Sequence, residues 1–200
     1  ARSFLPPDVV KRYIDVLSEL KMNRLHFHLV DDQGWRVESW TFPRLHEVGG
    51  IVSNMSRKKL EALKNVEFDE HGRRAPGGRF ETLSEARESR GYYTRDEIED
   101  MVEYAGDRHV MVVPEIDVPG HSSAMLAAYP DLSCSGKKVD VRGGPGIYPT
   151  ALCPGKEEVY EFLDRLFAEL SMMFPSPYVH IGSDEVFASD WLDYPPNKEL

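Results

Sequence analysis

The sequence has few cysteines, no excess of positive charge and no long apolar run. Only 2 of its 200 residues are cysteine, and 24 basic side chains stand against 34 acidic ones, for a net charge of −10. An acidic chain repels phosphate backbones and anionic lipids, so nucleic acids and membrane surfaces are poor partners for it. No apolar run reaches the roughly 18 residues that a membrane-spanning helix needs. Neutral or cationic ligands remain as candidate partners.

The chain also has no initiator methionine and no signal peptide, because it opens directly on Ala1-Arg2-Ser3-Phe4. We expect the natural N-terminus to lie upstream.

The two cysteines leave two interpretations open. Cys134 and Cys153 lie on either side of a stretch rich in glycine and proline. A disulfide would close that loop and indicate an oxidising compartment, whereas two free thiols would be usual in the cytosol. We favour the disulfide and a secreted or lysosomal or vacuolar location. The glycosylation sequon at Asn54 adds a little weight, since it matters only in a secreted chain.

Apolar periodicity predicts three helices that alternate with three strands. Asp8 is the expected cap of the first helix, and Thr94 with Glu97 forms a capping box at the start of the second. The expected helices cover residues 8–20, 94–105 and 157–174, and the expected strands cover 24–30, 109–113 and 178–181.

This alternation indicates an α/β fold with a parallel sheet, either an open doubly wound sheet or a (β/α)8 TIM barrel. No glycine-rich phosphate loop follows any strand, whereas acidic residues follow all three. Acidic clusters at strand ends share one cavity in a barrel, which favours the barrel. A full barrel takes about 250 residues, so we expect residues 1–200 to form its N-terminal part, with about four strands. Residues 51–90 are polar and are expected to form a surface insertion.

Half a barrel leaves sheet edges unpaired. We therefore expect these residues, expressed alone, to aggregate or to remain partly unfolded.

The adjacent carboxylates of Asp184 and Glu185 are candidate catalytic groups. Two like charges in a desolvated pocket raise one pKa, which leaves one acid protonated near neutral pH. His121 lies in a loop just after the second expected strand, where a proton relay is possible.

His26 and His28 have the spacing of a metal-binding pair on one face of a strand. Their position within the strand favours a different role, as core residues or as supports for neighbouring site residues. A metal-dependent, amidohydrolase-like barrel that uses these histidines with His121 remains an alternative.

Four ordered segments of the sequence resemble the catalytic domain of the β-N-acetylhexosaminidases, glycoside hydrolase family twenty. The segments are Ala1–Phe4, Lys21–Arg36, Val113–His121 and His180–Glu185.

The resemblance implies a (β/α)8 barrel that removes terminal β-linked N-acetylglucosamine or N-acetylgalactosamine from glycans. It implies that the substrate's own acetamido oxygen attacks the anomeric carbon, with no metal or cofactor. Glu185 would be the general acid and then the base, and Asp184 would hold the acetamido N–H. His121 with Asp31 would form the relay that tunes Glu185, and Arg2 would bind sugar hydroxyls.

One departure from the family pattern puts activity in question. Ser183 stands where the family usually has a second glycine before the acidic pair. If this position needs a positive φ, the serine would displace Asp184. A glycan-binding relative without catalysis is therefore a further alternative.

Overall fold

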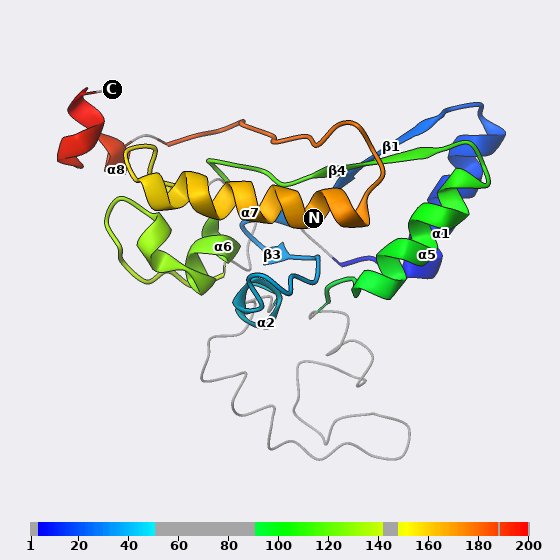
Figure 1. Ribbon diagram of the computed structural model, residues 1–200, viewed down its shortest axis with the longest axis horizontal. Coiled ribbons are helices and arrows are strands. Elements are labelled where there is room, and N and C mark those ends of the chain that lie inside the picture. Colours follow the sequence, from blue (N-terminus) through cyan, green and yellow to red (C-terminus); the bar gives the residue numbers. More distant parts are fainter. Residues whose placement is uncertain (1–3, 51–90, 142–147, 188, 200) are drawn as a thin grey trace, which may run out of the picture.

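The computed structural model describes residues 4–50, 91–141, 148–187 and 189–199 (Figure 1). Arg2, the sequon at Asn54 and the expected insertion at 51–90 lie outside the described residues.

Helices and short strands alternate along the described chain. In chain order the elements are α1 (Pro7–Glu19), β1 (Arg24–His28), β2 (Val30–Asp31), β3 (Gly34–Trp35), α2 (Arg44–Val48), α5 (Arg95–Gly106), β4 (Met111–Glu115), α6 (Ser123–Ala128), η1 (Pro130–Leu132), α7 (Glu157–Met173), α8 (Ser189–Leu192) and η2 (Pro195–Glu199). No helix in the described ranges is long and apolar enough to span a membrane.

The main sheet contains two parallel strands, β1 and β4. Their register pairs Arg24 with Met111 at one end and His28 with Glu115 at the other. Figure 1 shows α1 and α5, the helices around β1, lying side by side. Parallel strands joined through a helix end at the same edge of the sheet, so the acidic residues after β1 and β4 lie close together.

The third expected strand is wrong in detail. Residues 178–181 form only an isolated parallel bridge, between His180 and Glu115. The backbone still lies against the residues after β4, because Ile116 N–H donates to the His180 carbonyl at 3.0 Å and Val118 N–H donates to the Ile181 carbonyl at 2.9 Å. The described residues thus contain one parallel pair and an adjoining extended segment, and they close no barrel.

The bounds of the expected helices are confirmed to within about two residues. Of the two expected helix caps, only the one at Thr94 is confirmed. At α5 the Thr94 hydroxyl accepts from Glu97 N–H at 3.2 Å, and the Glu97 carboxylate accepts from Thr94 N–H at 2.9 Å. The prediction that Asp8 caps α1 is wrong. Pro6 occupies the cap position, and Asp8 lies in the first turn, where its charge still favours the helix dipole.

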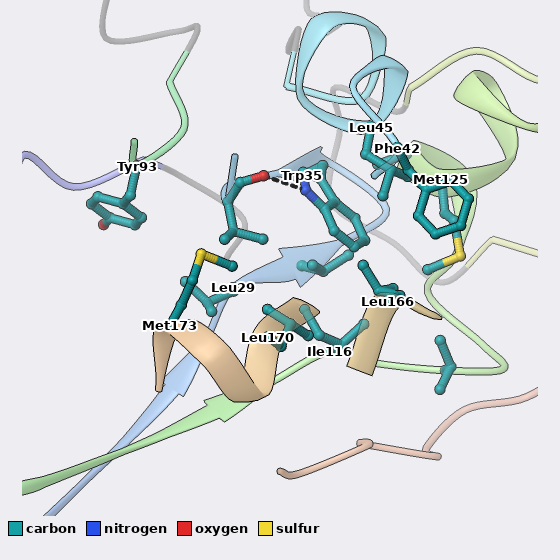
Figure 2. Close-up of a cluster of buried hydrophobic side chains, with 14 of the residues drawn as sticks. Leu29, Trp35, Phe42, Leu45, Tyr93, Ile116, Met125, Leu166, Leu170 and Met173 are labelled. Carbon is teal, nitrogen blue, oxygen red and sulfur yellow. Dashed lines mark hydrogen bonds between the residues drawn. The ribbon is translucent and has the colours of Figure 1, made fainter. Parts of the chain in front are cut away.

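The core lies where β3, α2, α6 and α7 meet. Figure 2 shows Trp35, Leu45, Met125 and Leu166 converging from these elements, and each is at most 1% exposed. The Trp35 indole N–H donates to the Val37 carbonyl at 2.5 Å, so its polar atom is satisfied inside the core.

A buried charge and a disulfide fix the loops around this core. The Arg36 guanidinium is fully buried and donates to the carbonyls of Gln33, Gly50 and Gly91. It therefore holds together the two chain positions that flank residues 51–90. Cys134 and Cys153 form a disulfide with Cα atoms 4.7 Å apart, in agreement with the expected bridge.

Glu169 on α7 anchors the loop after β3. Its carboxylate accepts from Ser39 Oγ at 3.0 Å, Trp40 N at 2.9 Å and Thr41 N at 3.1 Å, and the residue is 2% exposed. We predict that Glu169→Ala lowers the free energy of unfolding by about 2 kcal/mol, because the buried Ser39 hydroxyl and two part-buried backbone N–H groups lose their acceptor. Chemical denaturation of the whole protein measures the change.

The matched control is Glu158→Ala, since Glu158 is exposed on the same helix. Equal stability of the two variants would contradict the anchoring role of Glu169.

Candidate active site

The carboxyl ends of β1 and β4 bring three acidic segments together. Asp31 and Asp32 follow β1, and Glu115 and Asp117 lie at the end of β4. The bridge between Glu115 and His180 places the segment that leads to Asp184 beside them. Five acidic side chains and Glu185 thus surround one edge of the sheet.

Asp32 is the most buried charge of the site, with no exposed surface. Its Oδ1 accepts from Ser123 N at 3.1 Å, from Ser123 Oγ at 2.5 Å and from Thr150 Oγ1 at 3.2 Å. Its Oδ2 lies 3.1 Å from Nδ1 of His121. Neutral donors and one imidazole therefore replace the water that this carboxylate loses on burial.

His121 joins the acidic turn after β1 to the acidic pair. Its Nδ1 faces Asp32 Oδ2 at 3.1 Å and Asp31 Oδ1 at 3.2 Å, while Nε2 faces Glu185 Oε2 at 3.3 Å. Burial alone would lower the pKa of His121, but the surrounding carboxylates, with Asp117 first, raise it above its usual value. The ring is thereby favoured as a cation that offers an N–H on both sides.

The structure brings the predicted Asp31 and His121 together, and it adds Asp32, which sequence reasoning did not select as a site residue. Both carboxylates contact the same ring nitrogen, and Asp32 Oδ2 hydrogen-bonds with it. Ser123, two positions after His121, could have indicated the role of Asp32, because a buried carboxylate needs hydrogen-bond donors such as its hydroxyl.

The pKa of Asp31 lies below its usual value. Burial opposes ionisation, but hydrogen bonds from His28 and from Asp32 N–H outweigh it, so the pKa of Asp31 falls to about 2. The side chain is therefore an anion at neutral pH.

The acidic pair is more open than the groups behind it. The Asp184 side chain is 64% exposed and the Glu185 side chain is 48% exposed. Asp184 Oδ2 lies 3.8 Å from His121 Nε2. Two exposed carboxylates beside a buried imidazole can contact a ligand and exchange protons with the ring.

The backbone before this pair adopts the left-handed region. Gly182 has φ 64°, and a Cβ there would collide with the Asp117 carboxylate. Ser183 has φ 78°, a conformation that costs a non-glycine residue about 1–2 kcal/mol. Its hydroxyl donates to the Val118 carbonyl at 3.1 Å and its N–H donates to Asp117 Oδ1 at 3.1 Å, which offsets part of that cost. The serine is accommodated with the Asp184 carboxylate still beside His121.

Asp117 is a second buried acid that sequence reasoning did not select. It is 2% exposed, and burial, together with the nearby charge of Asp184, raises its pKa to about 6. Ser183 N–H partly offsets this by favouring the anion.

Three histidines contact the Glu115 carboxylate. Its Oε2 lies 2.6 Å from His26 Nε2 and 2.9 Å from His28 Nδ1, and its Oε1 lies 3.3 Å from His180 Nδ1. The expectation that His26 and His28 are core residues is wrong, since their side chains are 53% and 36% exposed. Their contacts agree with the other expected role, as supports of neighbouring site residues.

Histidine and carboxylate atoms in this region also come within 4.8 Å of one another in sets of three, such as His26, Glu115 and His180. Contacts with the Glu115 carboxylate orient these histidines.

Comparison with known proteins identifies the family. Residues 1–199 match the catalytic domain of glycosyl hydrolase family 20. The chain belongs to glycosyl hydrolase family 20. Among curated members, a β-hexosaminidase from Porphyromonas gingivalis is 34% identical over 95% of this chain and 21% of its own length, and one from Akkermansia muciniphila is 34% identical over 100% and 35%.

Solved family 20 structures agree. A Flavobacterium johnsoniae chitobiase has a TM-score of 0.75 and 37% identity over 99% of this chain and 24% of its own. A mutant Streptomyces plicatus β-hexosaminidase in complex with the product GlcNAc has a TM-score of 0.72 and 34% identity over 100% and 35%. The chain therefore spans about a fifth to a third of the length of these family members.

The raised pKa of Asp117 predicts a pH-dependent stability. A carboxyl that titrates near 3.8 when unfolded and about 6 when folded contributes stability below the lower value, and this is lost as pH rises through the higher one. Asp117→Asn keeps an oxygen for Ser183 N–H but removes the charge. We expect its melting temperature to match that of the wild type near pH 4 and to exceed it by about 2 °C or more near pH 7.

Thermal unfolding across this pH range is the measurement, with Asp107→Asn, at an exposed position, as the control. A difference between wild type and Asp117→Asn that does not grow with pH would contradict the assigned pKa.

Proposed function

We propose that the protein containing this chain is an exo-acting β-N-acetylhexosaminidase with substrate-assisted, retaining catalysis. The observation that carries the proposal is the position of His121, with carboxylates of Asp31 and Asp32 on one ring nitrogen and Glu185 on the other. Membership of glycosyl hydrolase family 20 supports it. The described elements would form part of a (β/α)8 barrel whose remaining strands complete the pocket.

Glu185 is the proposed general acid. It lies 3.3 Å from a buried imidazole whose pKa is raised, so its proton can be supplied and taken back through His121. In the first step Glu185 protonates the leaving glycosidic oxygen. In the second it accepts a proton from the water that opens the intermediate.

Asp184 is the proposed partner of the acetamido group. The substrate's acetamido oxygen forms a bond to the anomeric carbon as the bond to the leaving oxygen breaks, which gives an oxazolinium ion. The Asp184 carboxylate, adjacent to Glu185 and 64% exposed, accepts the acetamido N–H and stabilises the positive charge. Water then attacks the same carbon, so the product retains the β configuration.

The proposed substrates are glycans that end in β-linked N-acetylglucosamine or N-acetylgalactosamine. The GlcNAc product bound in the Streptomyces plicatus relative supports this class. Arg2 is the proposed donor to sugar hydroxyls at the non-reducing end. The disulfide between Cys134 and Cys153 supports an oxidising, secreted or lysosomal compartment.

The first test is Glu185→Gln, which keeps the shape of the side chain and removes the transferable proton. We predict a loss of kcat/KM by about a hundredfold to ten-thousandfold. The loss should be larger for an N-acetylglucosamine disaccharide than for the nitrophenyl glycoside, because a poor leaving group depends more on protonation. Initial rates on both substrates provide the measurement.

Glu19→Gln, at an exposed position on α1, is the matched control and should hydrolyse both substrates at the wild-type rate. Unchanged turnover by the Glu185 variant would reject the acid. A wild-type protein that binds N-acetylglucosamine oligomers without cleaving them would instead support the non-catalytic alternative, which the serine at position 183 suggests.

A further inference from the structure

The turn that carries the acidic pair is tied to the segment after β4 at Ser183. The Val118 N–H donates to the Ile181 carbonyl at 2.9 Å, and two residues later the Ser183 hydroxyl donates back to the Val118 carbonyl at 3.1 Å. The Ser183 N–H donates to Asp117 Oδ1, also at 3.1 Å. Both donor groups of Ser183 are therefore bound to the neighbouring segment, directly before Asp184.

The carboxylate of Asp184 has no such tie of its own. Among the residues that the structure describes, no hydrogen bond reaches this carboxylate, and Nε2 of His121 lies 3.8 Å from it. The side chain is 64% exposed. The backbone that leads into Asp184 thus determines where its carboxylate lies, because no described side-chain hydrogen bond fixes it.

This backbone has a conformation that a serine resists. Three non-glycine residues of the site have positive φ, namely His121 at 47°, Ser183 at 78° and Glu185 at 50°. The left-handed region is unfavourable for an L residue, whereas glycine enters it freely. A serine here therefore needs a compensating interaction. A change that removes this interaction but keeps the Cβ lets the backbone relax toward negative φ.

Close contacts confine the chain on both sides of Ser183. A Cβ on Gly182 would collide with the Asp117 carboxylate, and a Cβ on Gly120 would lie 2.9 Å from the Asp184 carbonyl oxygen. Because Gly182 is confined before it, a change of φ at Ser183 moves Asp184 rather than the preceding chain.

We infer that the Ser183 hydroxyl is a positioning group: its hydrogen bond to the Val118 carbonyl holds Ser183 in the left-handed conformation that presents Asp184 to the acetamido group. The inference rests on the proposed function, because the position of Asp184 matters only if its carboxylate meets the substrate. Ser183 touches none of the reacting atoms in this scheme and acts through Asp184. The hydrogen bond takes the place of the conformational freedom that a glycine would have.

Two substitutions of Ser183 separate the hydroxyl from the backbone strain. Ser183→Ala keeps the Cβ and removes the donor, so the strained backbone loses its tie. Ser183→Gly removes the donor and the strain together, so the left-handed conformation needs no tie. Ser171→Ala on α7 is the matched control, because the exposed Ser171 hydroxyl also donates to a backbone carbonyl, that of Ala168. The measurement is kcat and KM of the whole enzyme for nitrophenyl N-acetylglucosaminide.

We expect Ser183→Ala to lower kcat by about threefold to tenfold, the change that one net hydrogen bond makes in a conformational equilibrium. KM should change less, since Asp184 stabilises charge that develops in the transition state. Ser183→Gly should have a kcat well above that of Ser183→Ala, and Ser171→Ala should match the wild type. A wild-type kcat in Ser183→Ala, or an equal loss in Ser183→Ala and Ser183→Gly, would overturn the inference.

A second measurement asks whether the effect passes through Asp184. In an Asp184→Asn background, Ser183→Ala should cost less than about twofold in kcat, because the carboxylate that Ser183 positions is already absent. The same fold loss in both backgrounds would overturn the inference. If Ser183→Ala does not fold, Ser183→Cys replaces it. Its thiol is a weaker donor, so its kcat should lie below that of Ser183→Gly, and an equal kcat would contradict the role of the hydroxyl.

Glu185→Gln, assayed in parallel, separates this inference from the proposed function. Absent hydrolysis by the wild type, or full activity of Glu185→Gln, contradicts the proposed function itself. An inactive Glu185 variant beside a fully active Ser183→Ala variant contradicts only the role of Ser183.

Discussion

The buried carboxylate of Asp32 is the interaction on which the candidate site depends. A charge without exposed surface is stable only when hydrogen bonds replace its hydration, and Asp32 obtains them from His121, Ser123 and Thr150. His121 lies in the loop after β4, Ser123 begins α6, and Thr150 lies in the segment that leads to Cys153 of the disulfide. One carboxylate therefore joins three segments that are distant in sequence, and it fixes the ring that faces Glu185.

Several features follow from local sequence. Spacing of apolar residues is enough to place α1, α5 and α7, because an amphipathic helix needs only one buried stripe. Thr94 and Glu97 exchange hydrogen bonds within four residues, so their capping box can be predicted from the sequence without knowledge of tertiary contacts. The acidic residues after β1 and β4 predict the site for a similar reason, since parallel strands end at one edge. His121 and Glu185 belong to this predictable part.

Other features depend on contacts that local sequence does not encode. Asp31 and Asp32 are chemically identical neighbours. Only the fold determines that Asp32 is fully buried and accepts hydrogen bonds from Ser123 and Thr150. Residues 178–181 have the composition of a strand, but they make only one isolated bridge to Glu115 among the described residues. Two of the three histidines around Glu115 come from β1 and the third from the segment that bridges to Glu115, so the β1–β4 register and that bridge bring them together.

The central claim is that Asp184 and Glu185 act on one sugar while Asp31 and Asp32 hold His121 against Glu185. A crystal structure of the whole enzyme with a thiazoline analogue of the oxazolinium intermediate tests it most directly. We expect the Asp184 carboxylate at the ring nitrogen of the analogue, Glu185 on the face where the leaving oxygen departs, and His121 hydrogen-bonded to Glu185 and Asp32. An analogue bound away from both acids, or a His121 ring turned away from Glu185, would contradict it.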